Sequence, residues 1–135
     1  SMADNYDYVK NYLSDFRVND TGRTTGTFTN FDSLDDKIDD LYYYMQFIKF
    51  GFGRAVRDTS RFIQNNRLTK DEAIEIIRKY DGEFPSKNLK EVLEYLSLTE
   101  VELQKIIDKH RNSEIWNKNE KNDWLNSWEL KNKIY

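Results

Sequence analysis

The chain has 135 residues with 21 basic and 24 acidic side chains, so its net charge is −3 and whole-molecule attraction to nucleic acid is not expected. It has no cysteine, which excludes disulfides, thiolate metal sites and a cysteine nucleophile. Charged residues interrupt the apolar stretches and the first residues lack the order of a signal peptide, so we expect a cytoplasmic protein that spans no membrane and binds no nucleic acid.

The N-terminal part of the chain predicts two helices separated by a loop. Within residues 5–17, aromatic residues four apart indicate a short amphipathic helix. Residues 19–31 are rich in glycine, threonine and asparagine and lack an apolar period, so they predict an irregular loop. Asp32 and Ser33 are suited to cap a second helix, whose apolar stripe continues to Phe50.

Further helices are expected beyond the glycines of residues 51–53. A helical pattern runs from there to Asn65, and another follows Pro85. Thr69 and Thr99 each precede a glutamate by three residues, which is the spacing of a capping box at the start of a helix. No strand alternation or hairpin signal is found. The sequence therefore predicts an all-α fold, a small orthogonal bundle of about five to seven helices.

The C-terminal part is expected to differ from the helical body. We divide the chain into residues 1–2, expected to be an expression remnant, a helical domain over residues 3–112, and a tail over residues 113–135. The tail contains Trp116, Trp124 and Trp128, which either anchor it to the body or form an apolar patch for a partner.

Residues 22–28 form the first of two candidate binding segments. Their glycines allow close backbone approach, and Arg23 with several threonines supplies hydrogen-bond donors suited to phosphate or sugar hydroxyls. The segment is not a P-loop, because no Gly-Lys-Ser/Thr ending follows and no strand precedes it. A solvated linker between two helices explains the same composition equally well.

Residues 49–55 form the second candidate segment. Their glycines are able to expose backbone amides at a helix start, and Arg54, Arg57 and Arg61 recur at helical spacing as an anion-facing edge. Alternatively, Arg54 and Asp58 are four residues apart and pair on the surface, and the spacing alone favours this interpretation.

Two other groups of polar residues are weaker candidates. The acidic residues 35–40 offer the oxygen ligands that Mg²⁺ prefers, but neighbouring side chains on a helix diverge, so a solvated helix face is favoured. The single histidine, His110, is expected to compensate the dipole at a helix C-terminus rather than to act in catalysis.

Several segments, taken together, resemble the C-terminal region of N-acetyl sugar amidotransferases of the PseA/WbpG type. The resemblance covers the chain from about Tyr8 to Trp116, and its strength lies in the order and density of the matches. The matching segments are Arg23–Thr29, Ser33–Ile38, Tyr43–Tyr44, Phe47–Ala55 with Asp58 and Ser60, Arg67–Thr69 with Glu72 and Ala73, and Lys79–Pro85.

The resemblance implies an enzyme of surface-glycan biosynthesis. Members of that family convert a sugar acetamido group into an acetamidino group for lipopolysaccharide O-antigen or flagellin glycans. The reaction uses ATP to adenylylate the amide oxygen, which ammonia from a glutaminase partner then displaces. The substrate implied is a nucleotide-activated sugar.

The sequence departs from the family in one respect, because it has neither the SGGxDS-type pyrophosphate loop (PP-loop) nor the cysteine pairs of the family's N-terminal half. We therefore expect this chain to bind no cofactor, to depend on a PP-loop domain of the parent enzyme for ATP and Mg²⁺, and to be inactive alone. The alternative is a non-catalytic module that docks the glutaminase or forms a homodimer. If the domain packs on another domain, some apolar surface near the N-terminal helix is expected to be uncovered, and such a patch favours an enzyme fragment over a self-sufficient module.

The resemblance also indicates candidate substrate-binding residues, whereas no catalytic residue and no metal ligand is assigned. The residues that match are expected to lie on the side of the active site that meets the nucleotide or the sugar. They are Arg23, Thr24, Gly26, Thr27, Lys49, Gly51, Gly53, Arg54 and Asp58.

Overall fold

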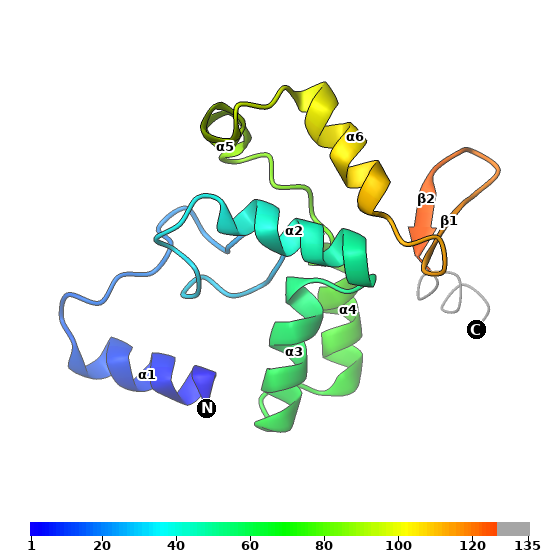
Figure 1. Cartoon of the computed structure of the whole chain (residues 1–135). Helices are drawn as coiled ribbons and strands as arrows, with labels where there is room; N and C mark the ends of the chain where they lie inside the picture. The colour runs from blue at the N-terminus through cyan, green and yellow to red at the C-terminus, as the bar shows by residue number, and fades with distance from the viewer. Residues whose placement is uncertain (127–135) are drawn as a thin grey trace.

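The computed structural model describes residues 1–126, which form six helices and one two-stranded hairpin (Figure 1). The predicted small, mainly helical fold is confirmed. The helices are α1 (Met2–Tyr12), α2 (Asp39–Phe50), α3 (Arg54–Gln64), α4 (Lys70–Tyr80), α5 (Leu89–Leu96) and α6 (Glu100–His110), and the strands are β1 (Trp116–Lys118) and β2 (Trp124–Asn126).

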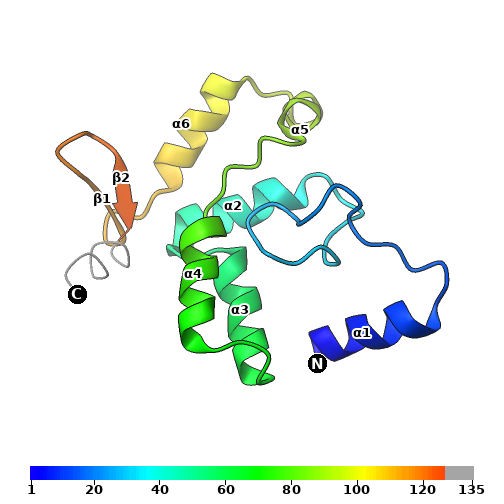
Figure 2. The ribbon, with the colours of Figure 1, turned by 180° about the vertical axis from the view of Figure 1, so that it is seen from behind.

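The arrangement of the helices is largely orthogonal. Helices α3 and α4 lie side by side as an antiparallel pair, and α2 runs across the top of this pair (Figures 1 and 2). Helices α5 and α6 lie on the other side of α2. The core joins α2, α5, α6 and β1 through the buried side chains of Leu41, Ile48, Val92, Leu93, Leu103, Ile107 and Trp116.

Both predicted capping boxes are confirmed. The Thr69 hydroxyl accepts a hydrogen bond from the Glu72 amide, and the Glu72 carboxylate accepts one from the Thr69 amide at 2.8 Å. Thr99 and Glu102 repeat the arrangement at the start of α6. Ser1 caps α1 in the same way. These boxes satisfy amide groups that a helix start otherwise leaves without partners.

The predicted start of the second helix is wrong, because α2 begins at Asp39 and not beside Asp32 and Ser33. Ser33 has φ of 52°, a left-handed conformation that is incompatible with a helix start there. The Asp36 carboxylate then accepts a hydrogen bond from the Ile38 amide at 3.0 Å. This local turn competes with helix formation over residues 34–38.

The hairpin of β1 and β2 was not predicted. Trp116 is opposite Asn126 in its register, and the Asn119 side chain organises the turn by accepting hydrogen bonds from the amides of Lys121 and Asp123. The Trp116 indole donates to the Ile48 carbonyl at 2.5 Å. Trp116 therefore anchors this segment to the body, whereas Trp128 lies outside the described residues.

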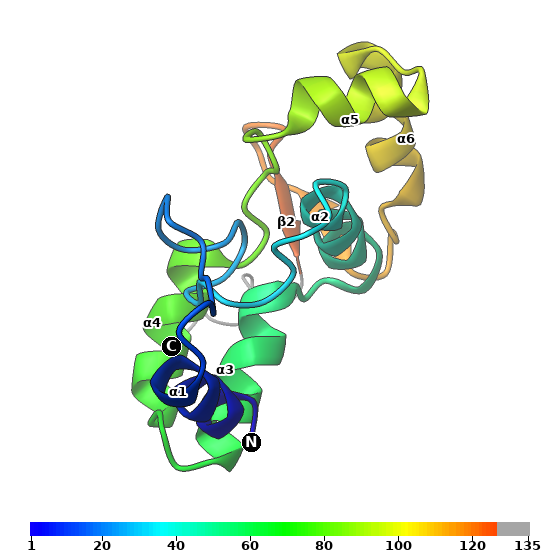
Figure 3. The ribbon, with the colours of Figure 1, turned by 90° about the vertical axis from the view of Figure 1, so that its left-hand side faces the viewer.

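Helix α1 lies near the end of the α3–α4 pair that is remote from α2, and ion pairs hold it to the segment that joins these two helices (Figures 1 and 3). Arg67, which follows α3, forms ion pairs with Asp4 and Asp7. Tyr8 and Tyr12 of α1 are exposed, so the predicted uncovered apolar surface near the N-terminal helix is confirmed. Within residues 1–126, no helix has both the length and the apolar character needed to cross a membrane.

Candidate functional site

The loop of residues 19–31 has a defined conformation. It contains no helix or strand, as predicted, and hydrogen bonds between its two arms close it. The Asn19 amide donates to the Asn30 carbonyl at 2.7 Å, and the Thr24 amide donates to the Thr29 carbonyl at 2.8 Å. The loop therefore folds back on itself and presents residues 23–27 to the helices.

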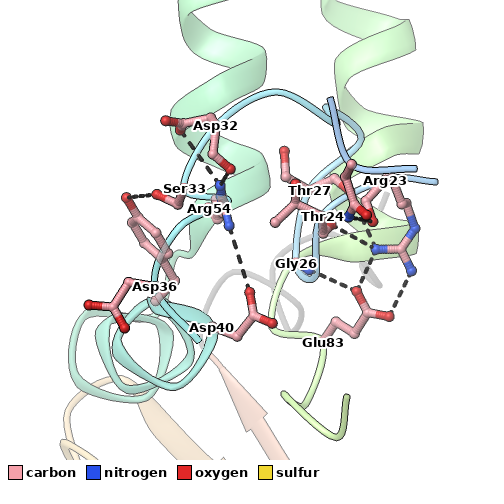
Figure 4. A network of polar contacts seen from close by, with 12 residues as sticks. Arg23, Thr24, Gly26, Thr27, Asp32, Ser33, Asp36, Asp40, Arg54 and Glu83 are labelled. Carbon is pink, nitrogen blue, oxygen red and sulfur yellow. Dashed lines mark hydrogen bonds and ion pairs between the residues drawn. The ribbon is translucent and has the colours of Figure 1, made fainter. Parts of the chain in front are cut away.

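Glu83, just beyond α4, clamps this loop (Figure 4). Its two carboxylate oxygens accept hydrogen bonds from the Arg23 guanidinium at 2.6 and 2.7 Å. The Gly26 amide donates to the same carboxylate at 2.7 Å. The Arg23 guanidinium also lies 4.2 Å from the centre of the Tyr80 ring. Arg23 is thus bound within the chain by a bidentate pair, the geometry that gives the strongest arginine contacts.

The clamp is expected to make stability depend on pH. The hydrogen bonds from Arg23 hold the pKa of Glu83 below its usual value, against the opposing effect of burial. A carboxyl with a lowered pKa stabilises the folded state above its unfolded pKa, about 4.3, and this contribution is lost as pH falls through the folded pKa. We expect Glu83→Gln to lower the free energy of unfolding by about 1 kcal/mol at pH 7.

Urea unfolding at several pH values between 7 and 3 checks this expectation. The difference between wild type and Glu83→Gln is expected to shrink toward the acid end, where the wild-type carboxyl is itself protonated. Glu91→Gln is the control, because the pair between Glu91 and Lys37 is much more exposed. A difference for Glu83→Gln that is the same at every pH contradicts the ionic role of the clamp.

Arg54 is almost completely buried, with 2% of its surface exposed. One terminal nitrogen donates to the Asp32 carbonyl at 2.6 Å, the other lies 3.9 Å from the Asp40 carboxylate, and the guanidinium lies 4.6 Å from the centre of the Tyr43 ring (Figure 4). Its Nε and Nη1 atoms have no hydrogen-bond partner among the described residues. Burial raises the pKa of Asp40, with Thr25 and Arg54 opposing this rise.

Asp58 is fully buried and does not pair with Arg54, so the predicted surface pair is wrong. The Thr27 hydroxyl donates to one Asp58 oxygen at 2.7 Å, and Arg57 Nε donates to the other at 2.9 Å. Arg57 also donates to the Asp32 carboxylate at 2.6 Å. The predicted anion-facing edge is therefore not formed as a whole, because α3 turns Arg54 and Arg57 toward carboxylates of the chain itself and only Arg61 is exposed.

The glycine junction between α2 and α3 binds an internal carboxylate. Gly51 has φ of 76° and ends α2 in the left-handed conformation. The amides of Gly53 and Ala55 donate to the two oxygens of Asp81 at 2.8 and 3.0 Å. The amides that were predicted to face an external anion are thus occupied by a side chain from the end of α4. Lys49 points to solvent beside this junction.

The structure separates the predicted site residues into two groups. The first group lies together around the clamped loop and consists of Arg23, Thr24, Gly26, Thr27, Arg54 and Asp58. Lys49, Gly51 and Gly53 lie apart, at the junction. The sequence analysis did not assign Asp32, Asp40, Asp81 or Glu83 as partners of these residues. The last two lie within a matching segment, but no local pattern shows which distant residue each one binds.

Two polar cavities adjoin the clamped loop. The first, which we call the loop cavity, has a volume of about 310 Å³ and is lined by the loop, by residues 33–40 and by Lys87 and Asn88. The second, the Glu83 cavity, also measures about 310 Å³. Thr24 lines the loop cavity, and its hydroxyl is buried without a hydrogen-bond partner among the described residues. Such a group is costly to bury unless a ligand or water satisfies it.

The chemistry that this arrangement suits is binding of a polar ligand. Hydroxyl, carboxylate and ammonium groups line both cavities, as a hydroxylated ligand requires. Among residues 1–126, no three histidine or acidic side chains are grouped so that they could hold a metal ion. In the acidic run, Asp36 turns to a backbone amide and Asp40 toward Arg54.

Comparison with known proteins identifies one family. The sequence model described as "LPS biosynthesis protein WbpG-like, C-terminal domain" matches residues 25–135. The match begins inside the loop of residues 19–31 and includes Asp32, Asp40, Asp81 and Glu83. No curated protein matches the chain.

Proposed function

The chain belongs to the WbpG-like C-terminal domain family of lipopolysaccharide biosynthesis proteins, and on this basis we propose that it is the helical domain of a cytoplasmic N-acetyl sugar amidotransferase. In the proposed reaction, the amide oxygen of a nucleotide-activated N-acetyl sugar is adenylylated by ATP, which releases pyrophosphate, and this activates the amide. Ammonia then attacks the amide carbon and the oxygen leaves with AMP, so that an acetamido group becomes an acetamidino group. The product enters O-antigen or flagellin glycan synthesis.

In this proposal, different domains or subunits bind ATP, supply ammonia and bind the sugar. A PP-loop domain binds ATP and Mg²⁺, a glutaminase partner supplies ammonia, and the helical domain contributes part of the sugar site. The observation that carries the last role is the loop cavity with its buried and unpartnered Thr24 hydroxyl. Arg23 lines this cavity and is held by Glu83, and Arg54 and Asp58 hold the neighbouring residues Asp32 and Thr27 through contacts within the chain. Their role is therefore to position the loop.

Thr24→Val in the full-length enzyme tests this role. The substitution keeps the side-chain shape and removes a hydroxyl that has no partner within residues 1–126, so folding is expected to be unaffected. We expect kcat/KM for ATP-dependent amidination of a nucleotide-activated N-acetyl sugar to fall about tenfold, as the loss of one substrate hydrogen bond would cause.

Thr29→Val is a matched control. Its hydroxyl is also buried and without a partner among the described residues, but Thr29 does not line either cavity. It is expected to keep wild-type kcat/KM. Equal activity of the Thr24 and Thr29 variants would remove the loop cavity from the substrate site, and absence of amidination in the wild-type enzyme would overturn the proposed reaction.

Docking of the glutaminase or of a second copy is a second candidate function, favoured by the exposed side of α1. Tyr8 and Tyr12 are 64% and 71% exposed, and their ring centres lie 4.5 Å apart. Paired aromatic residues are frequent anchors at protein interfaces. If this face docks the glutaminase, replacing both tyrosines by serine removes activity with glutamine and preserves activity with free ammonia.

A further inference from the structure

The two cavities share a wall, and Lys87 lies in that wall. Arg23, Thr25 and Lys87 line both the loop cavity and the Glu83 cavity. Each cavity is small, about 310 Å³, at the lower limit of about 300–1,000 Å³ for sites that enclose a drug-sized ligand. Each one therefore has room for one ring or one compact anionic group, and a larger ligand would need to occupy both.

The charges of the Glu83 cavity favour an anion. Its charged residues are Arg23, Glu83 and Lys87, and the first two neutralise each other as a bidentate pair. The Lys87 ammonium donates to the Thr21 hydroxyl at 2.7 Å and forms no ion pair within residues 1–126. Within this cavity one positive charge is thus left over, although Lys87 also attracts the Asp40 carboxylate of the neighbouring loop cavity. Ser86 lies in the same wall, whereas the Thr25 side chain is hydrogen-bonded to Asp40. Ammonium and hydroxyl donors are suited to phosphate oxygens.

The loop cavity has a different character. Its wall contains Thr24, whose buried hydroxyl has no hydrogen-bond partner among the described residues, and Asp40, which is half-buried. The carboxylates of Asp20 and Asp36 and the cations of Arg17 and Lys37 also line it, so charges of both signs are present. A neutral ring that carries hydroxyl or amide groups finds both donors and acceptors here, whereas a phosphate would meet the three carboxylates.

We propose that the two cavities form one bipartite site for a phosphate ester of a sugar, with the ring in the loop cavity against Thr24 and Asp40 and the phosphate in the Glu83 cavity on Lys87. This assignment deepens the function proposed above and rests on it for the choice of an N-acetyl sugar. Lys87 then determines specificity, because the site binds a phosphorylated sugar more tightly than a free one. The Thr21 hydroxyl holds the ammonium in place when no phosphate is bound.

Calorimetric titration of the 135-residue chain tests this assignment with three probes, N-acetylglucosamine 1-phosphate, N-acetylglucosamine and inorganic phosphate. We expect the sugar phosphate to bind at least about tenfold more tightly than either part alone. Lys87→Gln keeps a donor for Thr21 and is expected to weaken binding of the sugar phosphate about tenfold, with little change for the free sugar. Lys90→Gln, an exposed position outside both cavities, is the control, and thermal melting verifies folding.

Two results would overturn the bipartite site. One is that Lys87→Gln binds the sugar phosphate with wild-type affinity, and the other is that all three probes bind equally or none binds detectably. Binding by the chain requires neither ATP nor ammonia, so its failure is distinct from failure of the proposed reaction. If the full-length enzyme amidinates its sugar but Lys87→Gln binds normally, only the bipartite site is wrong. If the sugar phosphate binds through Lys87 and no amidination occurs, only the reaction is wrong.

Discussion

Arg54→Ala is expected to lower the free energy of unfolding by about 3 kcal/mol. The guanidinium is buried, and its removal leaves the Asp32 carbonyl without this donor and the Asp40 carboxylate without the cation that lies 3.9 Å away. Breaking a buried charge pair costs about 3–5 kcal/mol. We expect the lower end of this range, because the Asp32 side chain is partly exposed and two Arg54 nitrogens already lack partners.

Equilibrium unfolding in urea measures this effect, with Arg61→Ala as the control on the same helix. Arg61 is exposed, and its replacement is expected to change stability by less than about 0.5 kcal/mol. If Arg54→Ala lowers the free energy of unfolding as little as Arg61→Ala does, the buried contacts of Arg54 contribute little to stability. The expectation also matters for enzymology, because a loss of activity in Arg54→Ala would report a damaged fold rather than a lost substrate contact.

Gly82→Ala is expected to destabilise the domain by about 3 kcal/mol, because two separate costs add. Gly82 has φ of 75°, and a side chain in the left-handed conformation costs about 1–2 kcal/mol. In addition, a Cβ atom there would lie 2.3 Å from two atoms of the Phe47 ring, which itself packs edge-on against Trp116. Overpacking of a filled core costs about 1–3 kcal/mol.

Gly22→Ala separates these two costs. Gly22 also has a positive φ, 108°, but a Cβ atom there meets nothing within 4 Å. Its replacement is expected to cost only the backbone term of about 1–2 kcal/mol. Urea unfolding of both variants gives the packing term by difference. If Gly82→Ala is no less stable than Gly22→Ala, the Phe47 ring moves aside without cost, and its packing against Gly82 is looser than the structure shows.

The parts of the fold that could be predicted are those encoded locally. Thr69 and Thr99 each cap a helix through a glutamate three residues away, so the signal and the structure lie within one turn. The prediction of where α2 begins was wrong for a related reason. Leu34 continues the helical spacing of the apolar residues, but Ser33 is left-handed and Asp36 forms its own turn, and these local contacts decide the backbone.

The candidate site could be predicted only in part, because its polar partners are distant in sequence. The spacing from Arg54 to Asp58 suggested a pair, whereas in the structure each of them has partners from residues 27–40. The Asp81 carboxylate, at the end of α4, accepts hydrogen bonds from the amides of the glycine junction. A carboxylate in a sequence is equally compatible with solvent and with such a partner, and only the packing of α3 against α4 decides between them.

The clamp on the loop also determines when the loop can become ordered during synthesis on the ribosome. Arg23 and Gly26 meet Glu83 at separations of 60 and 57 residues. At about 5–20 residues per second, translation reaches Glu83 several seconds after it has passed the loop. A helix forms in about a microsecond or less, so α2, α3 and α4 are able to form before the clamp exists. The nascent loop therefore remains accessible to proteases and chaperones until the end of α4 has emerged from the ribosome.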